Sequence, residues 1–399
     1  MRRTSVNRGA VWHPDEFVLS FWCGPPEPFT TQERYREIKF AGFTHVMPPC
    51  AATTPALNRK ILDLCARVGL KAFVGDPRMP LRIEQEPDAK ARLDAIVADY
   101  AGHPALAGYH LTDEPNAGAF PGLAQVVAYL RERDPRHHTY INLFPNYAEA
   151  NRLGTPTYPE HLRRYMETVR PFVLSYDHYH FFQDGGERAE FFANLADVRR
   201  AANAHDTHFW NIVLATQHFG YRNLNEAELR YEAMQTLAYG GKGLLWFTYW
   251  MPGGVDPSWK EPMISGSGER TPHYYQVRRV NREVAAFGRE LLRADSLHVF
   301  HTGTPMPAGA AAPPPDAPLT VSGPGRLTVG VFRAPTRHTL AFVANVDYRN
   351  GVTTQVKTAA RNPRERFDPQ SGRWTLLPDG ETVALTLAPA AAALLRWEG

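Results

Sequence analysis

Short apolar segments alternate with amphipathic segments from residue 17 to about residue 290 of this 399-residue chain. The apolar segments read as strands, and the segment after each has helical spacing. Eight such pairs over roughly 275 residues match the number and size of the units in a (β/α)8 barrel. The predicted strands are 17–24, 43–48, 70–75, 106–112, 139–144, 172–176, 209–215 and 243–249.

An open doubly wound sheet is the alternative fold for alternating strands and helices. That fold normally carries a glycine-rich phosphate loop after its first strand. Here the first strand is followed by Cys23, Gly24, Pro25 and Pro26, which cannot form such a loop. The sequence therefore favours the barrel.

The pattern changes after residue 302. Residues 303–318 are rich in Pro and Ala and read as a linker or loop. Short alternating runs then follow, separated by turn pairs such as Asn350-Gly351 and Ser371-Gly372. We therefore predict a catalytic barrel over 1–302, a linker over 303–318 and an antiparallel β-sandwich over 319–399.

Composition limits the partners of the chain. Lys and Arg number 44 against 41 Asp and Glu, a net charge of +3 that gives no electrostatic signature for nucleic acid or an anionic membrane. No apolar run approaches the roughly 18 residues that span a bilayer. A homo-oligomer is compatible with this composition. Cys23, Cys50 and Cys65 show no disulfide or zinc spacing, and we expect small buried side chains.

The first residues are basic without an apolar stretch behind them, which is not a secretory signal. We expect a cytoplasmic protein if this is the full chain, and a periplasmic or secreted one if a leader was removed.

Barrel enzymes carry their active sites at the C-terminal ends of the strands. The fourth strand ends in Asp113 and Glu114, followed by Pro115. Adjacent, partly buried carboxylates raise the pKa of one of the pair, as a general acid needs near neutral pH. We predict Glu114 as the acid, Asp177 after the sixth strand as the second carboxylate, and Asp113 as a catalytic neighbour.

Aromatic residues make up 12% of the chain, and many fall at the predicted strand ends. Aromatic faces stack on the apolar faces of ligands such as sugars. We predict an uncharged carbohydrate as the substrate. The predicted substrate-binding residues are Trp22, Asp76, Arg78, Asn142, His178, Tyr179, Gln217, His218, Trp246, Tyr249 and Trp250.

Two segments resemble the clan A glycoside hydrolases. The Asp113-Glu114-Pro115 segment is similar to the Asn-Glu-Pro motif of that clan, and residues 237–250 are similar to its eighth-strand segment, especially in beta-galactosidase-like members. The C-terminal β-domain is similar to the accessory domains of these enzymes. The resemblance implies a retaining O-glycosidase of oligo- or polysaccharides that needs no cofactor, with Glu114 as proton donor and Asp113 near the sugar 2-hydroxyl.

The seventh strand departs from that clan. The resemblance implies a nucleophilic Glu at its end, where this chain has Gln217 and His218. Asp177 is the leading substitute, and Asp76 is the next. Two alternatives stay open: a non-catalytic carbohydrate-binding barrel, which predicts no second carboxylate near Glu114, and a metal-dependent hydrolase or lyase, which predicts converging His and Asp ligands. We expect no metal and a substrate-covering loop over 251–270.

Overall fold

A computed structural model describes residues 15–253, 258–358, 364–378 and 382–398. Eight parallel strands form one sheet in the order β1-β8-β7-β6-β5-β4-β3-β2. Between β1 and β2, the Thr44 N–H donates to the Leu19 carbonyl at 2.9 Å. The predicted barrel is confirmed. The strands are β1 (Val18–Phe21), β2 (His45–Val46), β3 (Lys71–Val74), β4 (Leu106–Asp113), β5 (His138–Leu143), β6 (Val173–His178), β7 (His208–Leu214) and β8 (Gly243–Phe247).

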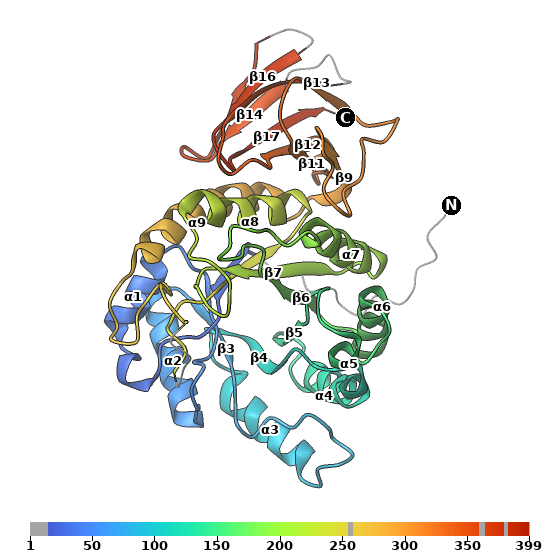
Figure 1. Cartoon of the computed structure of the whole chain (residues 1–399). Helices are drawn as coiled ribbons and strands as arrows, with labels where there is room; N and C mark the ends of the chain where they lie inside the picture. Colours follow the sequence, from blue (N-terminus) through green and yellow to red (C-terminus); the bar gives the residue numbers. More distant parts are fainter. Residues whose placement is uncertain (1–14, 254–257, 359–363, 379–381, 399) are drawn as a thin grey trace.

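Helices surround this sheet (Figure 1). Several begin at threonine caps: the Thr31 and Thr54 side chains accept from the backbone N–H groups of Arg34 and Leu57. Two 3-10 turns, η1 (Glu27–Phe29) and η2 (Ala117–Ala119), lie in the connections. The helices are α1 (Gln32–Phe40), α2 (Pro55–Val68), α3 (Ala89–Tyr100), α4 (Phe120–Arg133), α5 (Ala150–Leu153), α6 (Tyr158–Val169), α7 (Phe191–Ala204), α8 (Glu226–Ala238) and α9 (Pro272–Leu291).

The C-terminal part forms two antiparallel sheets, as predicted, and rests on α8 and α9 (Figure 1). One sheet has the order β15-β14-β17-β12-β11-β9 and the other β10-β13-β16. The strand β9 lies within the predicted barrel range yet pairs with β11, so the antiparallel part begins at Asp295. The strands are β9 (Asp295–Thr302), β10 (Leu319–Ser322), β11 (Leu327–Arg333), β12 (His338–Asn345), β13 (Val352–Thr358), β14 (Arg364–Asp368), β15 (Arg373–Leu376), β16 (Thr382–Leu387) and β17 (Ala392–Glu398).

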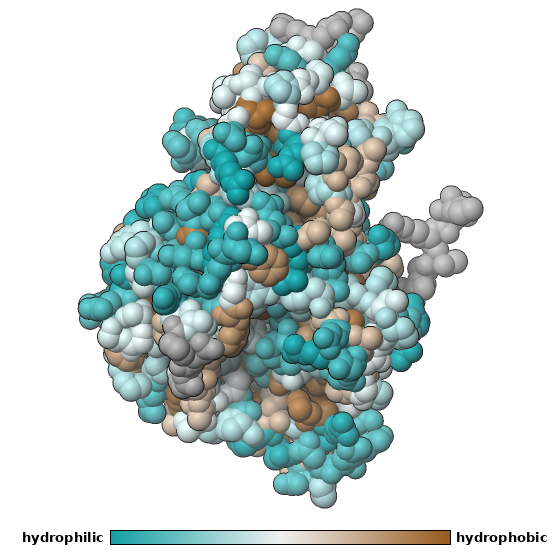
Figure 2. Space-filling model, viewed as in Figure 1, coloured by the Kyte–Doolittle hydropathy of each residue, from teal (hydrophilic) through white to brown (hydrophobic). Residues whose placement is uncertain are grey.

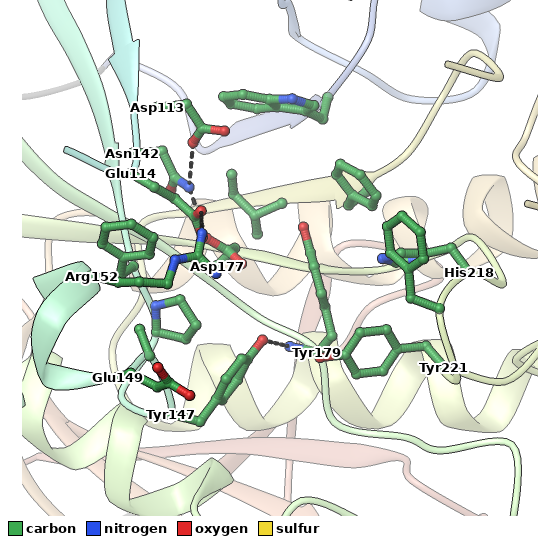
Figure 3. Close-up of a pocket in the computed structure, with 17 residues that line it drawn as sticks. Asp113, Glu114, Asn142, Tyr147, Glu149, Arg152, Asp177, Tyr179, His218 and Tyr221 are labelled. Carbon is green, nitrogen blue, oxygen red and sulfur yellow. Dashed lines mark hydrogen bonds and ion pairs between the residues drawn. The ribbon is translucent and has the colours of Figure 1, made fainter. Parts of the chain in front are cut away.

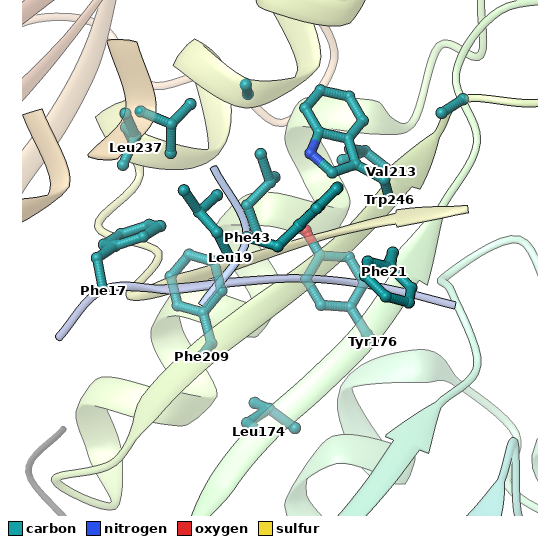
Figure 4. Close-up of a cluster of buried hydrophobic side chains, with 14 of the residues drawn as sticks. Phe17, Leu19, Phe21, Phe43, Leu174, Tyr176, Phe209, Val213, Leu237 and Trp246 are labelled. Atoms are coloured by element: carbon teal, nitrogen blue, oxygen red, sulfur yellow. The ribbon is translucent and has the colours of Figure 1, made fainter. Parts of the chain in front are cut away.

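The layer between sheet and helices is a continuous apolar core that includes Trp246 (Figure 4). Successive strand residues face opposite sides of a sheet, so Leu245 and Phe247 face the barrel interior while Trp246 faces the helices. Its indole donates to Asn281 Oδ1 on α9 at 2.8 Å. The prediction that Trp246 binds substrate is therefore corrected: it is a fully buried core residue.

Two further aromatics of this segment are corrected in the same way. Tyr249 is fully buried and stacks on Phe21, with ring centroids 4.5 Å apart. Trp250 is 4% exposed and packs on Phe29 at 4.5 Å. Both rings face the packed layer beside β1 instead of an open cavity, so they contribute burial and not a stacking surface.

A disulfide joins Cys23 and Cys50, whose Cα atoms are 4.7 Å apart. The expectation of buried cysteines is confirmed for Cys65, which is free, and for Cys23, but it is wrong for Cys50, which is exposed. The sequence also showed no sign of the disulfide. Cys23 follows β1 and Cys50 follows β2, and the barrel brings these two strand ends together although 27 residues separate them.

The face of the molecule in Figure 2 is largely hydrophilic over the barrel helices, with small hydrophobic patches between them. Among the described residues, no helix combines the length and apolar character needed to cross a bilayer.

Candidate active site

A cavity of about 580 Å³ opens at the C-terminal ends of the barrel strands. Its wall contains all three predicted catalytic carboxylates, Asp113, Glu114 and Asp177 (Figure 3). The remaining lining residues are Trp22, Asn142, Phe144, Pro145, Tyr147, Ala148, Glu149, Arg152, Tyr179, Ile212, His218, Phe219, Tyr221 and Phe247.

The end of β4 aims Glu114 into this cavity. Asp113 is the last residue of the strand, and Glu114 has a φ of +44°. A non-glycine residue in this left-handed region costs on the order of 1 kcal/mol and persists only where its surroundings hold it. The Glu114 N–H donates to the Asn142 carbonyl of β5 at 2.8 Å, which fixes the turn. Such local strain is typical of functional sites.

Asn142 holds two of the acids from a neighbouring strand. Its Nδ2 donates to Asp113 Oδ1 at 3.1 Å and to Asp177 Oδ1 at 2.9 Å. The opposite side of its amide, Oδ1, accepts from the Ser175 hydroxyl at 3.2 Å. These bonds orient the amide, so that its donor side faces the acids of β4 and β6.

Glu114 and Asp177 lie next to each other in the cavity wall (Figure 3), close enough for the charge of Glu114 to raise the pKa of Asp177. Asp177 is 5% exposed, and burial together with the charges of Glu114 and Asp113 holds its pKa well above the usual range. Burial and the negative charge of Asp113 raise the pKa of Glu114 to about 7. Two neighbouring buried carboxyls retain one proton between them near neutral pH, because desolvation and charge repulsion disfavour ionisation of both. The pair can therefore hold one acid and one carboxylate together.

Arg152 is a site residue that the sequence analysis missed. It lies on the short helix α5, and its Nη2 is 3.2 Å from Glu114 Oε2. The Asn116 Nδ2 donates to the Arg152 carbonyl at 2.9 Å and so anchors this helix beside the turn after β4. A four-residue helix has too little periodicity to be seen in the sequence.

An aromatic wall faces the acids across the cavity. The Tyr179 hydroxyl points toward the cavity centre (Figure 3), and its ring packs at 5.2 Å from Phe247 and 5.5 Å from His218. His218 stacks on Trp259 at 4.5 Å, which brings the loop after β8 against the site. The sequence predicted Trp22, Tyr179 and His218 here. Tyr147, Phe219 and Tyr221 were missed, although Tyr147 directly follows the fifth strand end.

Four further predicted binding residues lie outside this cavity, and their predictions are corrected. Arg78 binds Asp76 through Nε at 2.9 Å and Asp99 through Nη2 at 2.7 Å, so its guanidinium forms an ion-pair network. His178 is fully buried behind the wall, with its Nδ1 2.8 Å from Asn194 Oδ1.

Gln217 is the third of these residues. It forms a strand-like bridge with Lys260 and does not line the cavity. Asp76 lines a second cavity instead of the first.

In the part of the chain that the structure describes, no three His, Cys, Asp or Glu side chains are placed to hold a metal ion.

No family model matches this sequence, and neither does any curated protein. Solved structures do match. A catalytic mutant of Gan42B, a GH42 beta-galactosidase from G. stearothermophilus, aligns over 95% of this chain and 98% of its own with a TM-score of 0.62 and 8% identity.

A glycoside hydrolase family 5 protein from Bacteroides vulgatus ATCC 8482 aligns over 96% of this chain and 90% of its own, with a TM-score of 0.60 and 10% identity. The chain has the fold of barrel glycoside hydrolases. It spans 62% of the beta-galactosidase of Marinomonas ef1, at a TM-score of 0.50 and 11% identity over 70% of this chain. At these identities the likeness establishes the barrel fold alone, and the chemistry has to be inferred from the residues of the cavity.

Proposed function

We propose that this chain is a glycoside hydrolase that cleaves O-glycosidic bonds of an oligo- or polysaccharide with Glu114 and Asp177. The observation that carries the proposal is the closeness of these two carboxyls inside a cavity with an aromatic wall. Glycoside hydrolysis needs one protonated and one ionised carboxyl at the scissile bond. This closeness also counts against a non-catalytic barrel, which predicts no second carboxylate near Glu114.

The proposed reaction has two steps. The Glu114 carboxyl gives its proton to the glycosidic oxygen as the bond to the anomeric carbon breaks, and the leaving group departs as an alcohol. Asp177 forms a bond to that carbon as the ionised member of the pair, so the proton that the two buried carboxyls share must lie on Glu114 when substrate is bound. Glu114 then removes a proton from water, whose oxygen attacks the anomeric carbon and releases Asp177 as a carboxylate. The sugar leaves with the configuration it had in the substrate.

The closeness of the two carboxyls supports retention. Inverting enzymes hold their carboxyls about 6.5–9.5 Å apart to admit a water, whereas retaining enzymes hold them about 5–5.5 Å apart. The two carboxyls lie next to each other in one wall of the cavity, which fits the shorter separation better than the longer one. The neighbouring Asp113 would raise the pKa of Glu114 and accept from a sugar hydroxyl.

A panel of aryl glycosides and oligosaccharides tests this function. We expect hydrolysis of at least one sugar class, and a loss of about 10²–10⁴-fold in turnover for Glu114→Gln with binding retained. Glu149→Gln is the matched control, because Glu149 lines the same cavity with an exposed side chain. No hydrolysis across the panel, or near-normal turnover of Glu114→Gln, would contradict the proposal.

A further inference from the structure

We propose that a second cavity, beside the first, binds an apolar leaving group of the substrate, such as an aryl group. This inference rests on the proposed function, because a leaving group exists only if a glycosidic bond is cleaved. The second cavity has a volume of about 460 Å³ and lies at the ends of β1 to β4. A volume in this range holds a small organic ligand.

Trp22 joins the two cavities. It lines both of them, and its ring contacts His110 of β4 edge-on at 5.4 Å. In a bound substrate whose sugar lies beside Glu114, Trp22 therefore lies between the sugar and the leaving group. Cys50 also lines the second cavity, and the disulfide ties it to Cys23, the residue after Trp22.

Two polar side chains of the second cavity, Asp76 and Thr53, already have partners within the protein. Asp76 accepts from Arg78 Nε at 2.9 Å through Oδ1 and from the Tyr100 hydroxyl at 2.7 Å through Oδ2. The Thr53 hydroxyl donates to the Gly75 carbonyl at 2.6 Å. These groups have little hydrogen-bonding capacity left for sugar hydroxyls, and a sugar would lose hydrogen bonds to water without replacing them.

Apart from His110, whose ring lies against Trp22, the other side chains of the wall are apolar. Met79 and Leu81 come from the loop after β3, and Met47 with Pro48 and Pro49 from the end of β2. Leu81 is 44% exposed, so a large aliphatic side chain stands at this cavity without a protein partner covering it. Met side chains adapt to apolar and aromatic ligands through a flexible, polarisable thioether. The first cavity differs, because several carboxyls line it, whereas the one acid of the second cavity, Asp76, is paired with Arg78.

The occupant that fits this surface is a flat or aliphatic apolar group linked to the sugar. A second sugar is disfavoured because nothing on Met79, Leu81 or the prolines can bind its hydroxyls. We therefore place the sugar in the first cavity, Trp22 between the two parts, and the apolar leaving group in the second.

Calorimetric titration of the full chain with 2-naphthol tests the site without requiring hydrolysis. We expect saturable binding, weakened about tenfold or more in Leu81→Asp and in Met79→Asp, because each change places a charge against an apolar ligand. The matched controls are Leu376→Asp and Met306→Asp, at exposed residues outside both cavities. These should bind 2-naphthol as the wild type does.

The kinetic comparison uses an aryl glycoside and the methyl glycoside of the same sugar. Leu81→Asp should raise KM for the aryl glycoside about tenfold and change KM for the methyl glycoside about twofold at most. Equal 2-naphthol binding by wild type, Leu81→Asp and Met79→Asp would overturn the site. Binding that these variants weaken, in a chain that hydrolyses no glycoside, would support the apolar site while removing the proposed function.

Discussion

Arg152 and Glu114 form an ion pair at the rim of the cavity, with Nη2 and Oε2 3.2 Å apart. The arginine side chain is 60% exposed and the glutamate 28%, so the guanidinium approaches the acid from the solvent side. Its charge opposes the burial and the Asp113 charge that raise the pKa of Glu114. Burial therefore raises the pKa of Glu114 most, and the charges of Asp113 and Arg152 adjust it in opposite directions.

Removing the positive charge should shift activity to higher pH. The pKa of Glu114, about 7, sets the alkaline limit of activity if Glu114 must donate a proton. Arg152→Gln removes the charge that lowers this pKa, so the ratio of kcat/KM at pH 8 to that at pH 6 should rise about two- to fivefold. The control is Arg163→Gln, an exposed arginine that pairs with Glu160. A ratio that stays constant or falls would contradict the role of Arg152.

Removing the negative neighbour should act in the opposite direction. Asp113 raises the pKa of Glu114 by charge repulsion. In Asp113→Asn the acid should lose its proton at lower pH, so the same pH 8 to pH 6 ratio of kcat/KM should fall about two- to fivefold. A pH–rate profile measures this. If the apparent pKa of the alkaline limb rises instead, Asp113 does not act on Glu114 through its charge.

The raised pKa of Glu114 also predicts how stability depends on pH. The folded chain holds this proton up to about pH 7, whereas an unfolded glutamate loses it near pH 4.5. The free energy of unfolding should therefore fall as pH rises between these values. In Glu114→Gln the fall between pH 5 and pH 8 should be smaller by about 1–3 kcal/mol.

Urea unfolding of wild type and Glu114→Gln at both pH values measures that difference. Glu149→Gln, with its exposed carboxyl in the same cavity, should follow the wild type. Identical pH dependence in wild type and Glu114→Gln would mean that Glu114 has an ordinary pKa in the folded chain.

The disulfide between Cys23 and Cys50 should stabilise the barrel. It closes a loop across 27 residues, and such a crosslink contributes about 2–4 kcal/mol. Cys50→Ser should lower the free energy of unfolding by that amount. A reductant should lower the urea midpoint of the wild type and leave that of Cys50→Ser unchanged. A wild type that does not respond to reductant under unfolding conditions would argue against the bond.

The sequence alone predicts the barrel because burial imposes a repeating pattern on every strand and helix. It also predicts the acids, because Asp113, Glu114 and Asp177 are polar residues at or just after apolar strands, where burying them is costly. The sequence does not show that strand β9 belongs to the C-terminal part, because only the fold reveals its pairing with β11.

Other features need three-dimensional contacts that no local pattern carries. Trp246 and Phe247 are adjacent aromatics, and only the pairing of β8 decides that the first faces the helices and the second the cavity. The Cys23–Cys50 bond depends on two strand ends meeting. Arg152 reaches Glu114 from a four-residue helix that the sequence does not signal.

Turnover of Asp177→Asn against Asp76→Asn, on the best substrate of the panel, tests the catalytic pair most directly. Both residues are buried acids at the barrel mouth, but Asp177 lies next to Glu114 whereas Asp76 is paired with Arg78. We predict that Asp177→Asn loses about 10³-fold or more in kcat, and that folded Asp76→Asn stays within about tenfold of wild type. Near-normal turnover of Asp177→Asn would contradict the assignment of this pair.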